Sequence, residues 1–189
     1  MSAIVIAPFS NSGIRDWPST SYRRLIGVLL ERLEPDAAIR VIGTANQKLR
    51  ANEVVRDFPA TRVVNECGRL SWAGMIGALR AASCVVGNNS GVAHLGGFFG
   101  VPTVCVFGAS HQRHEWRALG QSVILVTRAI GCSPCHLDHG QVSPYDKACL
   151  REIEPETVAD AAFTIMARVA GMRAQGSAMT GATALGGAG

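Results

Sequence analysis

A small polar cluster, Gly-Asn-Asn-Ser-Gly at residues 87–91, separates two apolar runs of the chain and is followed by His94. A helix that begins here presents unpaired backbone N–H groups and the positive end of its dipole, and both attract phosphate. Gly91 lets a phosphate approach the backbone closely, and Ser90 and His94 can add hydrogen-bond donors. The same spacing suits a simple helix cap at Asn89 or Ser90 with a core histidine, so the residues alone leave both interpretations open.

Three cysteines with the spacing of metal ligands lie further along the chain, Cys132, Cys135 and Cys149, with His136 and His139 between them. Two thiolates at this spacing and a third form a tetrahedral set if a histidine completes it. In a reducing compartment the same residues remain free thiols, and no disulfide is expected. The pattern therefore leaves two alternatives, a structural metal such as zinc or reduced loop thiols.

The hydrophobic pattern predicts the scaffold that must position these residues. Apolar runs typical of strands alternate with helix-like stretches. The predicted strands are 4–10, 39–43, 62–66, 84–88, 102–108 and 122–127, and the predicted helices are 18–33, 46–56, 71–82, 91–99 and 155–171. This alternation predicts an α/β fold, a doubly wound, Rossmann-like parallel sheet with both faces covered by helices. Ligands bind such sheets beyond the carboxyl ends of the strands, where residues 88–94 are expected.

Composition limits the number of domains. With 189 residues, of which 48% are hydrophobic, the chain can bury one good core. Residues 1–172 are predicted to form one Rossmann-like domain. Residues 173–189 are rich in Ala and Gly without periodicity and are predicted to be a disordered tail.

Charge and hydropathy narrow the class of partner. The net charge of +4 is spread over single Arg residues, with no run of Lys or Arg. An anionic small ligand is therefore favoured, and neither nucleic acid nor a membrane surface is expected as a partner. The chain has no apolar stretch of 18 residues, and its first residues lack a basic leader and a cleavage site. These features predict a cytoplasmic protein with no transmembrane segment.

The segment at 85–110 resembles the signature of glycosyltransferase family 9, the heptosyltransferases of lipopolysaccharide synthesis. That signature has a strand, Gly-Asn-Asp-Ser/Thr-Gly, a histidine three residues on, and Gly-x-Pro before the next strand. Further segments are similar to the family in the same order: PFSNSGIRDWP at 8–18, IGTANQK at 42–48, GRLSWAGMIGALRAASCVVGNN at 68–89, and CSPC at 132–135 with ACLREIEPETV at 148–158. The likeness covers roughly residues 4–170.

The resemblance implies roles for single residues. Ser90 and Gly91 match the residues that hold the diphosphate of a nucleotide-sugar such as ADP-heptose, and Ser10 lies in the matching first loop. His94 matches a histidine beside the donor, and Arg15 falls where a basic residue neutralises the phosphates, so these two are the catalytic candidates. Such donors would stabilise the leaving nucleoside diphosphate without a metal, and no cofactor is required.

Two substitutions depart from the family pattern. Asn89 stands where the family has Asp, and Asn46 and Gln47 stand where it has a Glu expected to hold the ribose. All three residues are still predicted to bind the donor, as neutral groups.

The resemblance also implies a missing partner. The family has the two-domain fold called GT-B, and this chain resembles only the C-terminal, donor-binding half. The N-terminal half supplies contacts to a glycan or glycolipid acceptor and the expected catalytic base. A separate second half or a homo-oligomer is therefore expected, and Asp16 and Glu115 are the best carboxylate candidates in this chain.

Two loops carry further expectations. His111, Arg113 and His114 follow the fifth predicted strand, where the family places a loop over the donor sugar, although a solvated basic loop explains them equally well. Some autotransporter heptosyltransferases that resemble this family hold an iron through a cysteine finger in the segment of Cys132 and Cys135. Zinc or iron is therefore the candidate metal.

Three functions follow from these observations. The leading hypothesis is the donor-binding domain of a glycosyltransferase similar to family 9. The alternative is a non-catalytic nucleotide-binding module that regulates or scaffolds a partner transferase. An unrelated enzyme on the same fold is the third, because a fold alone does not define a function. No Gly-x-Gly-x-x-Gly follows the first predicted strand, which argues against NAD.

Overall fold

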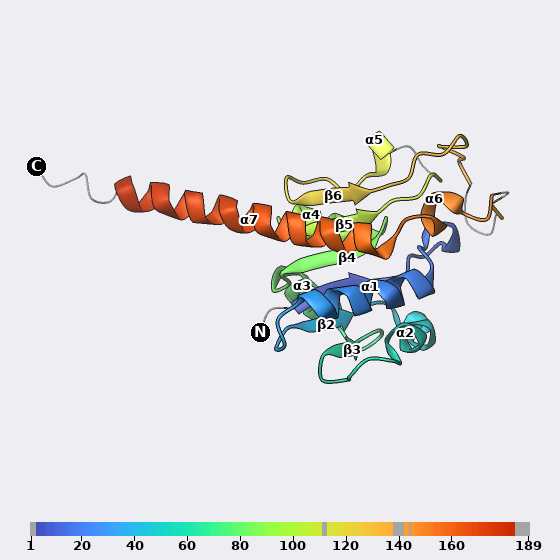
Figure 1. The fold of residues 1–189 in the computed structure, drawn as a ribbon, viewed down its shortest axis with the longest axis horizontal. Helices are drawn as coiled ribbons and strands as arrows, with labels where there is room; N and C mark the ends of the chain where they lie inside the picture. Colours follow the sequence, from blue (N-terminus) through green and yellow to red (C-terminus); the bar gives the residue numbers. More distant parts are fainter. Residues whose placement is uncertain (1–2, 111–112, 138–141, 144, 184–189) are drawn as a thin grey trace, which may run out of the picture.

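Six short apolar runs form the six strands of one parallel sheet, which lies between two layers of helices (Figure 1). The computed structural model describes residues 3–110, 113–137, 142–143 and 145–183. The strands are β1 (Ala3–Ala7), β2 (Ala38–Val41), β3 (Val63–Asn65), β4 (Cys84–Asn88), β5 (Thr103–Val106) and β6 (Val123–Val126). All neighbouring strands pair in parallel, in the order β3-β2-β1-β4-β5-β6. The predicted doubly wound α/β fold is confirmed.

Helices connect each strand to the next and follow the last strand. They are the 3-10 helices η1 (Gly13–Arg15) and η2 (Ala45–Gln47), and α1 (Ser19–Arg32), α2 (Lys48–Val55), α3 (Trp72–Arg80), α4 (Gly91–Phe98), α5 (Arg113–Trp116), α6 (Ala148–Arg151) and α7 (Pro155–Thr183). Helix α1 follows Pro18, and the hydroxyl of Ser71 accepts a hydrogen bond from the Gly74 N–H at the start of α3. Pro155 opens α7 at its first position, where its missing N–H costs nothing.

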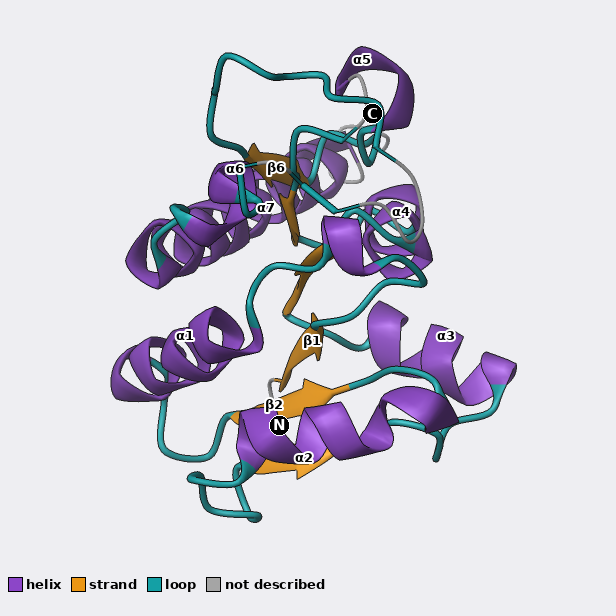
Figure 2. Ribbon diagram, turned by 90° about the vertical axis from the view of Figure 1, so that its right-hand side faces the viewer, coloured by secondary structure: helices purple, strands orange, loops and turns teal. Residues whose placement is uncertain are grey.

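Strand residues alternate between the two faces of the sheet. Ile4 and Ile6 pack in a core layer with residues of α1, α2 and α7, whereas Val5 and Ala7 pack with residues of α3 and α4. Figure 2 shows α1 and α7 on one side of the sheet and α3 and α4 on the other. Because both faces are buried, the strands are continuous apolar runs rather than alternating ones.

The strand order reverses between β1 and β4, which are adjacent in the sheet although β2 and β3 lie between them in the sequence. The loops that leave the carboxyl ends of these two strands lead to helices on opposite faces, α1 and α4. A crevice forms at this point in doubly wound sheets. Residues 88–94 lie at this edge, as predicted.

The last helix is longer than the predicted 155–171. Helix α7 continues to Thr183, so residues 173–183 are helical, and residues 184–189 lie outside the described chain. Val169 is buried, and residues 170–175, which follow it, are exposed. Figure 1 shows this end of α7 projecting beyond the sheet. Ala, Met, Gln and Arg favour helix, and the segment has no proline to end it, which explains why the helix continues past residue 171.

Over the described residues, α7 and every other helix is too short or too polar to cross a membrane.

Candidate functional site

A pocket of about 1140 Å³ opens at the carboxyl edge of the sheet, beside the point where the strand order reverses. Its walls are the loop after β1, the end of β2 with η2, the start of α3 and the start of α4. The lining residues are 7, 9–11 and 15, 42–47 and 50, 68, 70–72 and 75, and 90–92. This volume is sufficient for a nucleotide-sized ligand.

The start of α4 forms the polar end of the pocket. Ser90 is the residue before the helix, and its hydroxyl makes no capping bond. The Ser90 Oγ atom is buried and has no hydrogen-bond partner among the described residues. A Cβ atom placed on Gly91 would meet no described atom within 4 Å, so the pocket reaches the helix backbone here. Both residues line the pocket, as an anion site at this helix start requires.

Arg15 contributes the second unsatisfied group. It ends η1, lines the pocket, and donates from Nη2 to the Asn11 Oδ1 atom. Its Nε atom is buried and, over the described part of the chain, has no partner. Buried donors without partners are rare in folded proteins, and an oxyanion in the pocket would satisfy both Arg15 Nε and Ser90 Oγ.

Asn89 and His94 flank the start of α4 but are not among the residues that line the pocket. The His94 Nε2 atom lies 3.1 Å from the Oδ1 atom of Asn89, an amide oxygen that can only accept. The proton of a neutral ring is therefore on Nε2. Burial and, to a lesser degree, the charge of Arg15 lower the pKa of His94, which keeps the ring neutral at neutral pH. Direct contact of either residue with a donor stays a prediction.

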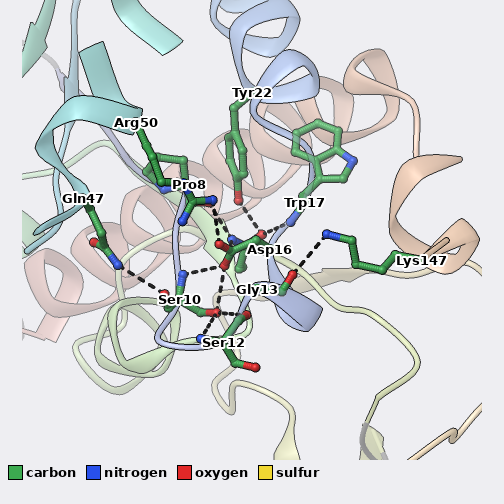
Figure 3. A network of polar contacts seen from close by, with 11 residues as sticks. Pro8, Ser10, Ser12, Gly13, Asp16, Trp17, Tyr22, Gln47, Arg50 and Lys147 are labelled. Atoms are coloured by element: carbon green, nitrogen blue, oxygen red, sulfur yellow. Dashed lines mark hydrogen bonds and ion pairs between the residues drawn. The ribbon is translucent and has the colours of Figure 1, made fainter. Parts of the chain in front are cut away.

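Ser10 lines the pocket, but its hydroxyl is already engaged. The Ser10 Oγ lies 2.7 Å from the carbonyl oxygen of Ser12 and 2.8 Å from Oδ1 of Asp16, both acceptors for its single proton (Figure 3). Ser10 and Asp16 therefore bond each other within the loop after β1, and direct contact of Ser10 with a donor stays a prediction. The Asp16 carboxylate is buried and does not face the pocket.

Asn46 and Gln47 lie in η2, which forms part of the pocket wall. The Gln47 Oε1 atom accepts from the Thr44 N–H at 2.9 Å, and its Nε2 donates to the Ser10 carbonyl at 3.2 Å. Gln47 therefore joins η2 to the loop after β1. Asn46 is exposed in the pocket wall, and its Oδ1 accepts from the Thr44 hydroxyl. Of the two residues, Asn46 is the better placed to meet a ligand.

Sequence reasoning missed the apolar end of the pocket and one cation. Leu70, Trp72 and Met75 line the pocket at the start of α3, and Trp72 is 68% exposed. Arg50 of α2 lines it as well, with its guanidinium 4.1 Å from the ring centroid of Phe9. The sequence signal for Trp72 was a large aromatic residue directly after Ser71, the predicted start of a helix. Arg50 carried no local signal.

The three cysteines lie near one another but form no metal site in the described chain. The Cys135 N–H donates to the Ala109 carbonyl at 2.9 Å, and the Ala109 N–H donates to the Cys149 thiol at 3.3 Å. Burial, with smaller effects of Cys135 and Cys132, raises the pKa of Cys149, which favours the neutral thiol. No three Cys, His, Asp or Glu side chains in the described ranges are arranged to hold a metal. His136 is exposed, and His139 lies outside these ranges.

The loop after β5 is described only in part. His111 lies outside the described residues, whereas Arg113, His114 and Glu115 belong to the short helix α5.

Comparison with known proteins places this site in a family. The sequence model of glycosyltransferase family 9 (heptosyltransferase) matches residues 2–145. Lipopolysaccharide heptosyltransferase 1 of Pseudomonas aeruginosa is 29% identical over 122 residues, which cover 64% of this chain and 32% of that protein.

Two solved structures share the fold. ADP-heptose lipopolysaccharide heptosyltransferase II of E. coli superposes with a TM-score of 0.73 at 17% identity, over 88% of this chain and 47% of that one. The dodecameric iron-containing heptosyltransferase TibC of enterotoxigenic E. coli, in complex with ADP-D-beta-D-heptose, gives 0.63 at 18% identity, over 87% and 45%. The chain thus spans a third to a half of the length of these relatives. Because the family model covers most of the chain, this protein belongs to glycosyltransferase family 9, the heptosyltransferase family.

Proposed function

We propose that this chain is the donor-binding half of a heptosyltransferase and that it binds a nucleoside diphosphate sugar of the ADP-heptose type. The observation that carries the proposal is the pair of buried, unpartnered donors, Ser90 Oγ and Arg15 Nε, beside the open start of α4. Residues that carry three kinds of donor, a hydroxyl, a guanidinium and helix N–H groups, therefore line one pocket. That combination fits a diphosphate.

The shape of the pocket orients the ligand. With the diphosphate at α4, the nucleobase would lie toward the apolar residues Leu70, Trp72 and Met75 at the start of α3. The exposed Trp72 indole offers a flat surface for stacking. Asn46, on the wall between these ends, would accept or donate to the ribose hydroxyls.

In this proposal the protein's own donors stabilise the leaving diphosphate. As the bond to the sugar breaks, negative charge grows on the diphosphate. Arg15 and the α4 N–H groups would stabilise this charge by donating hydrogen bonds. No Asp or Glu is among the described residues that line the pocket, so binding is expected without magnesium.

The base that takes the proton of the acceptor hydroxyl must come from elsewhere, and Asp16 is too enclosed to reach it. We therefore infer that an N-terminal half, on another chain or in another part of a longer protein, completes the enzyme. Its acceptor would be a glycan or glycolipid. The lack of a pocket carboxylate also favours the second candidate function, a non-catalytic nucleotide-binding module.

Two measurements test these proposals. Calorimetry with ADP, UDP and GDP, each with and without EDTA, should show binding of at least one nucleotide that EDTA leaves unchanged. The chain alone should not transfer sugar, and it should do so when a family 9 N-terminal half is added. Failure of all three nucleotides to bind would refute the donor site, whereas binding without transfer in the reconstituted pair would support the non-catalytic module.

A further inference from the structure

The carboxylate of Asp16 is the centre of a buried hydrogen-bond network behind the pocket (Figure 3). Its Oδ1 atom accepts from the backbone N–H of Ser10 at 2.7 Å and from the Ser10 hydroxyl at 2.8 Å. Its Oδ2 atom accepts from Nη2 of Arg50 at 3.0 Å. Asp16 is 3% exposed, so these bonds replace its contact with water. A buried carboxylate is stable only when it is paired in this way.

Asn88 ties the same network to the neighbouring strand. It ends β4, is fully buried, and lies two residues before Ser90. Its Nδ2 group donates to the Pro8 carbonyl at 2.7 Å and toward Asp16 Oδ1 at 3.3 Å. Its Oδ1 atom accepts from the Trp17 N–H at 3.0 Å and from the Tyr22 hydroxyl at 2.9 Å. One side chain of β4 thus holds both ends of the loop that follows β1.

This arrangement sets the position of Arg15. Arg15 directly precedes Asp16, and its own side chain is held only by Asn11, a residue of the same loop, among the contacts of the described chain. Asp16 and Asn88 therefore hold the loop from within, Gln47 and Lys147 bond its Ser10 and Gly13 carbonyls from outside, and Arg15 contributes no bond beyond the loop among the described contacts. Arg50 also lines the pocket, but its guanidinium donates to the Asp16 carboxylate. Arg15 is therefore the guanidinium available to bind an anion.

We propose that Asp16 is a positioning residue of the donor site, because its carboxylate locks the β1–α1 loop to β4 and so holds Arg15 opposite the start of α4. The inference rests on the proposed nucleotide site. Asp16 touches no ligand in this proposal. Its contribution is preorganisation. The loop is already ordered before the diphosphate binds, so the free energy of ordering the loop does not reduce the binding affinity.

The test is Asp16→Asn, which keeps the size of the side chain but removes its charge and places an amide where two acceptor oxygens stood. Affinity for ADP, measured by calorimetry, should fall about tenfold, since charged hydrogen bonds that hold the loop are lost. Affinity for adenosine, measured by saturation-transfer NMR, should stay within about twofold, because adenosine lacks the phosphates that Arg15 meets. The matched control is Asp36→Asn, an exposed residue before β2 at the opposite edge of the sheet.

A double-mutant cycle separates positioning from general damage. If Asp16 acts through Arg15, then Asp16→Asn should weaken ADP binding little further in an Arg15→Met background. Equal losses in both backgrounds, or equal losses for ADP and adenosine, would overturn the proposal. Ser10→Ala, which removes one donor to Asp16, provides a milder second variant with the same expected dependence on Arg15 if Asp16→Asn does not fold. Normal ADP binding by Asp16→Asn would refute this inference alone, whereas a wild-type protein that binds no nucleotide would refute the proposed function as well.

Discussion

The Nε2 atom of His94 lies 3.1 Å from the Oδ1 atom of Asn89, which joins the first turn of α4 to the loop before it. Asn89 stands where an aspartate was expected from the family pattern. An aspartate would favour a charged imidazolium at this position, whereas the neutral amide does not. The pair in this protein therefore suits a neutral histidine, in agreement with the lowered pKa of His94.

This relationship predicts how stability responds to acid. Burial and the charge of Arg15 lower the pKa of His94 below 6.5, so the unfolded chain binds this proton more readily than the folded protein. The free energy of unfolding should therefore decrease as the pH falls through 6.5 toward the folded pKa. His94→Gln should reduce this decrease in urea unfolding measured across that range. The control is His136→Gln, at an exposed position, and an equal effect of both variants would contradict the prediction.

Gly91 allows a direct test of where the phosphate binds. Its Cβ position faces open space among the described residues, so Gly91→Val should leave the fold and melting temperature nearly unchanged. The new side chain would occupy the space beside the α4 N–H groups, and ADP affinity should fall at least about tenfold. His94→Ala should cost less, because it removes one group that does not line the pocket. Calorimetry on both variants checks the order, and unchanged affinity in both would place the ligand elsewhere.

Two helix glycines should respond oppositely to alanine. A Cβ on Gly97 would lie 2.3 Å from the Leu119 carbonyl oxygen, so Gly97→Ala should lower the free energy of unfolding by about 1–3 kcal/mol. A Cβ on Gly77, in α3, would meet no described atom within 4 Å, and Gly77→Ala should raise it by about 0.5–1 kcal/mol. Urea unfolding of both variants measures the difference. Equal effects would show that α4 does not pack on the segment before β6 as described.

The projecting end of α7 should contribute little to stability. No residue from 170 to 175 is buried, so removal of residues 173–189 should change the melting temperature by less than about 2 °C. Circular dichroism should show a loss of helix. Ile165→Ala, in the packed part of the same helix, should instead cost about 2–5 kcal/mol. A large drop in melting temperature on truncation would mean that residues 173–183 pack against another surface in solution.

Much of the fold was predictable because its signals are local. Six apolar runs of strand length, separated by helices with Pro and Ser at their starts, indicated the parallel sheet and its two helical layers. The Gly-Asn-Asn-Ser-Gly cluster predicted the helix start that lies in the pocket wall. The last helix was predicted too short because the absence of an amphipathic pattern says that a segment lacks a packing face, not that it lacks helix propensity.

The sequence by itself determined the element types, the edge of the sheet where the site lies, and Ser90 and Gly91 at a helix start, because propensity, periodicity and capping act over a few neighbouring residues. Arg15 as a site residue came from the family resemblance, and it lines the pocket. Only the tertiary structure decided what these residues meet. Asp16 pairs with Arg50 from α2, and Asn88 from β4 bonds the loop after β1, which are contacts across 34 and 72–80 residues. Trp72 begins α3, the helix that connects β3 to β4. Because β2 and β1 lie between these two strands in the sheet, this connection brings Trp72 to the pocket beside them. Such contacts depend on the order of strands, which no single segment encodes.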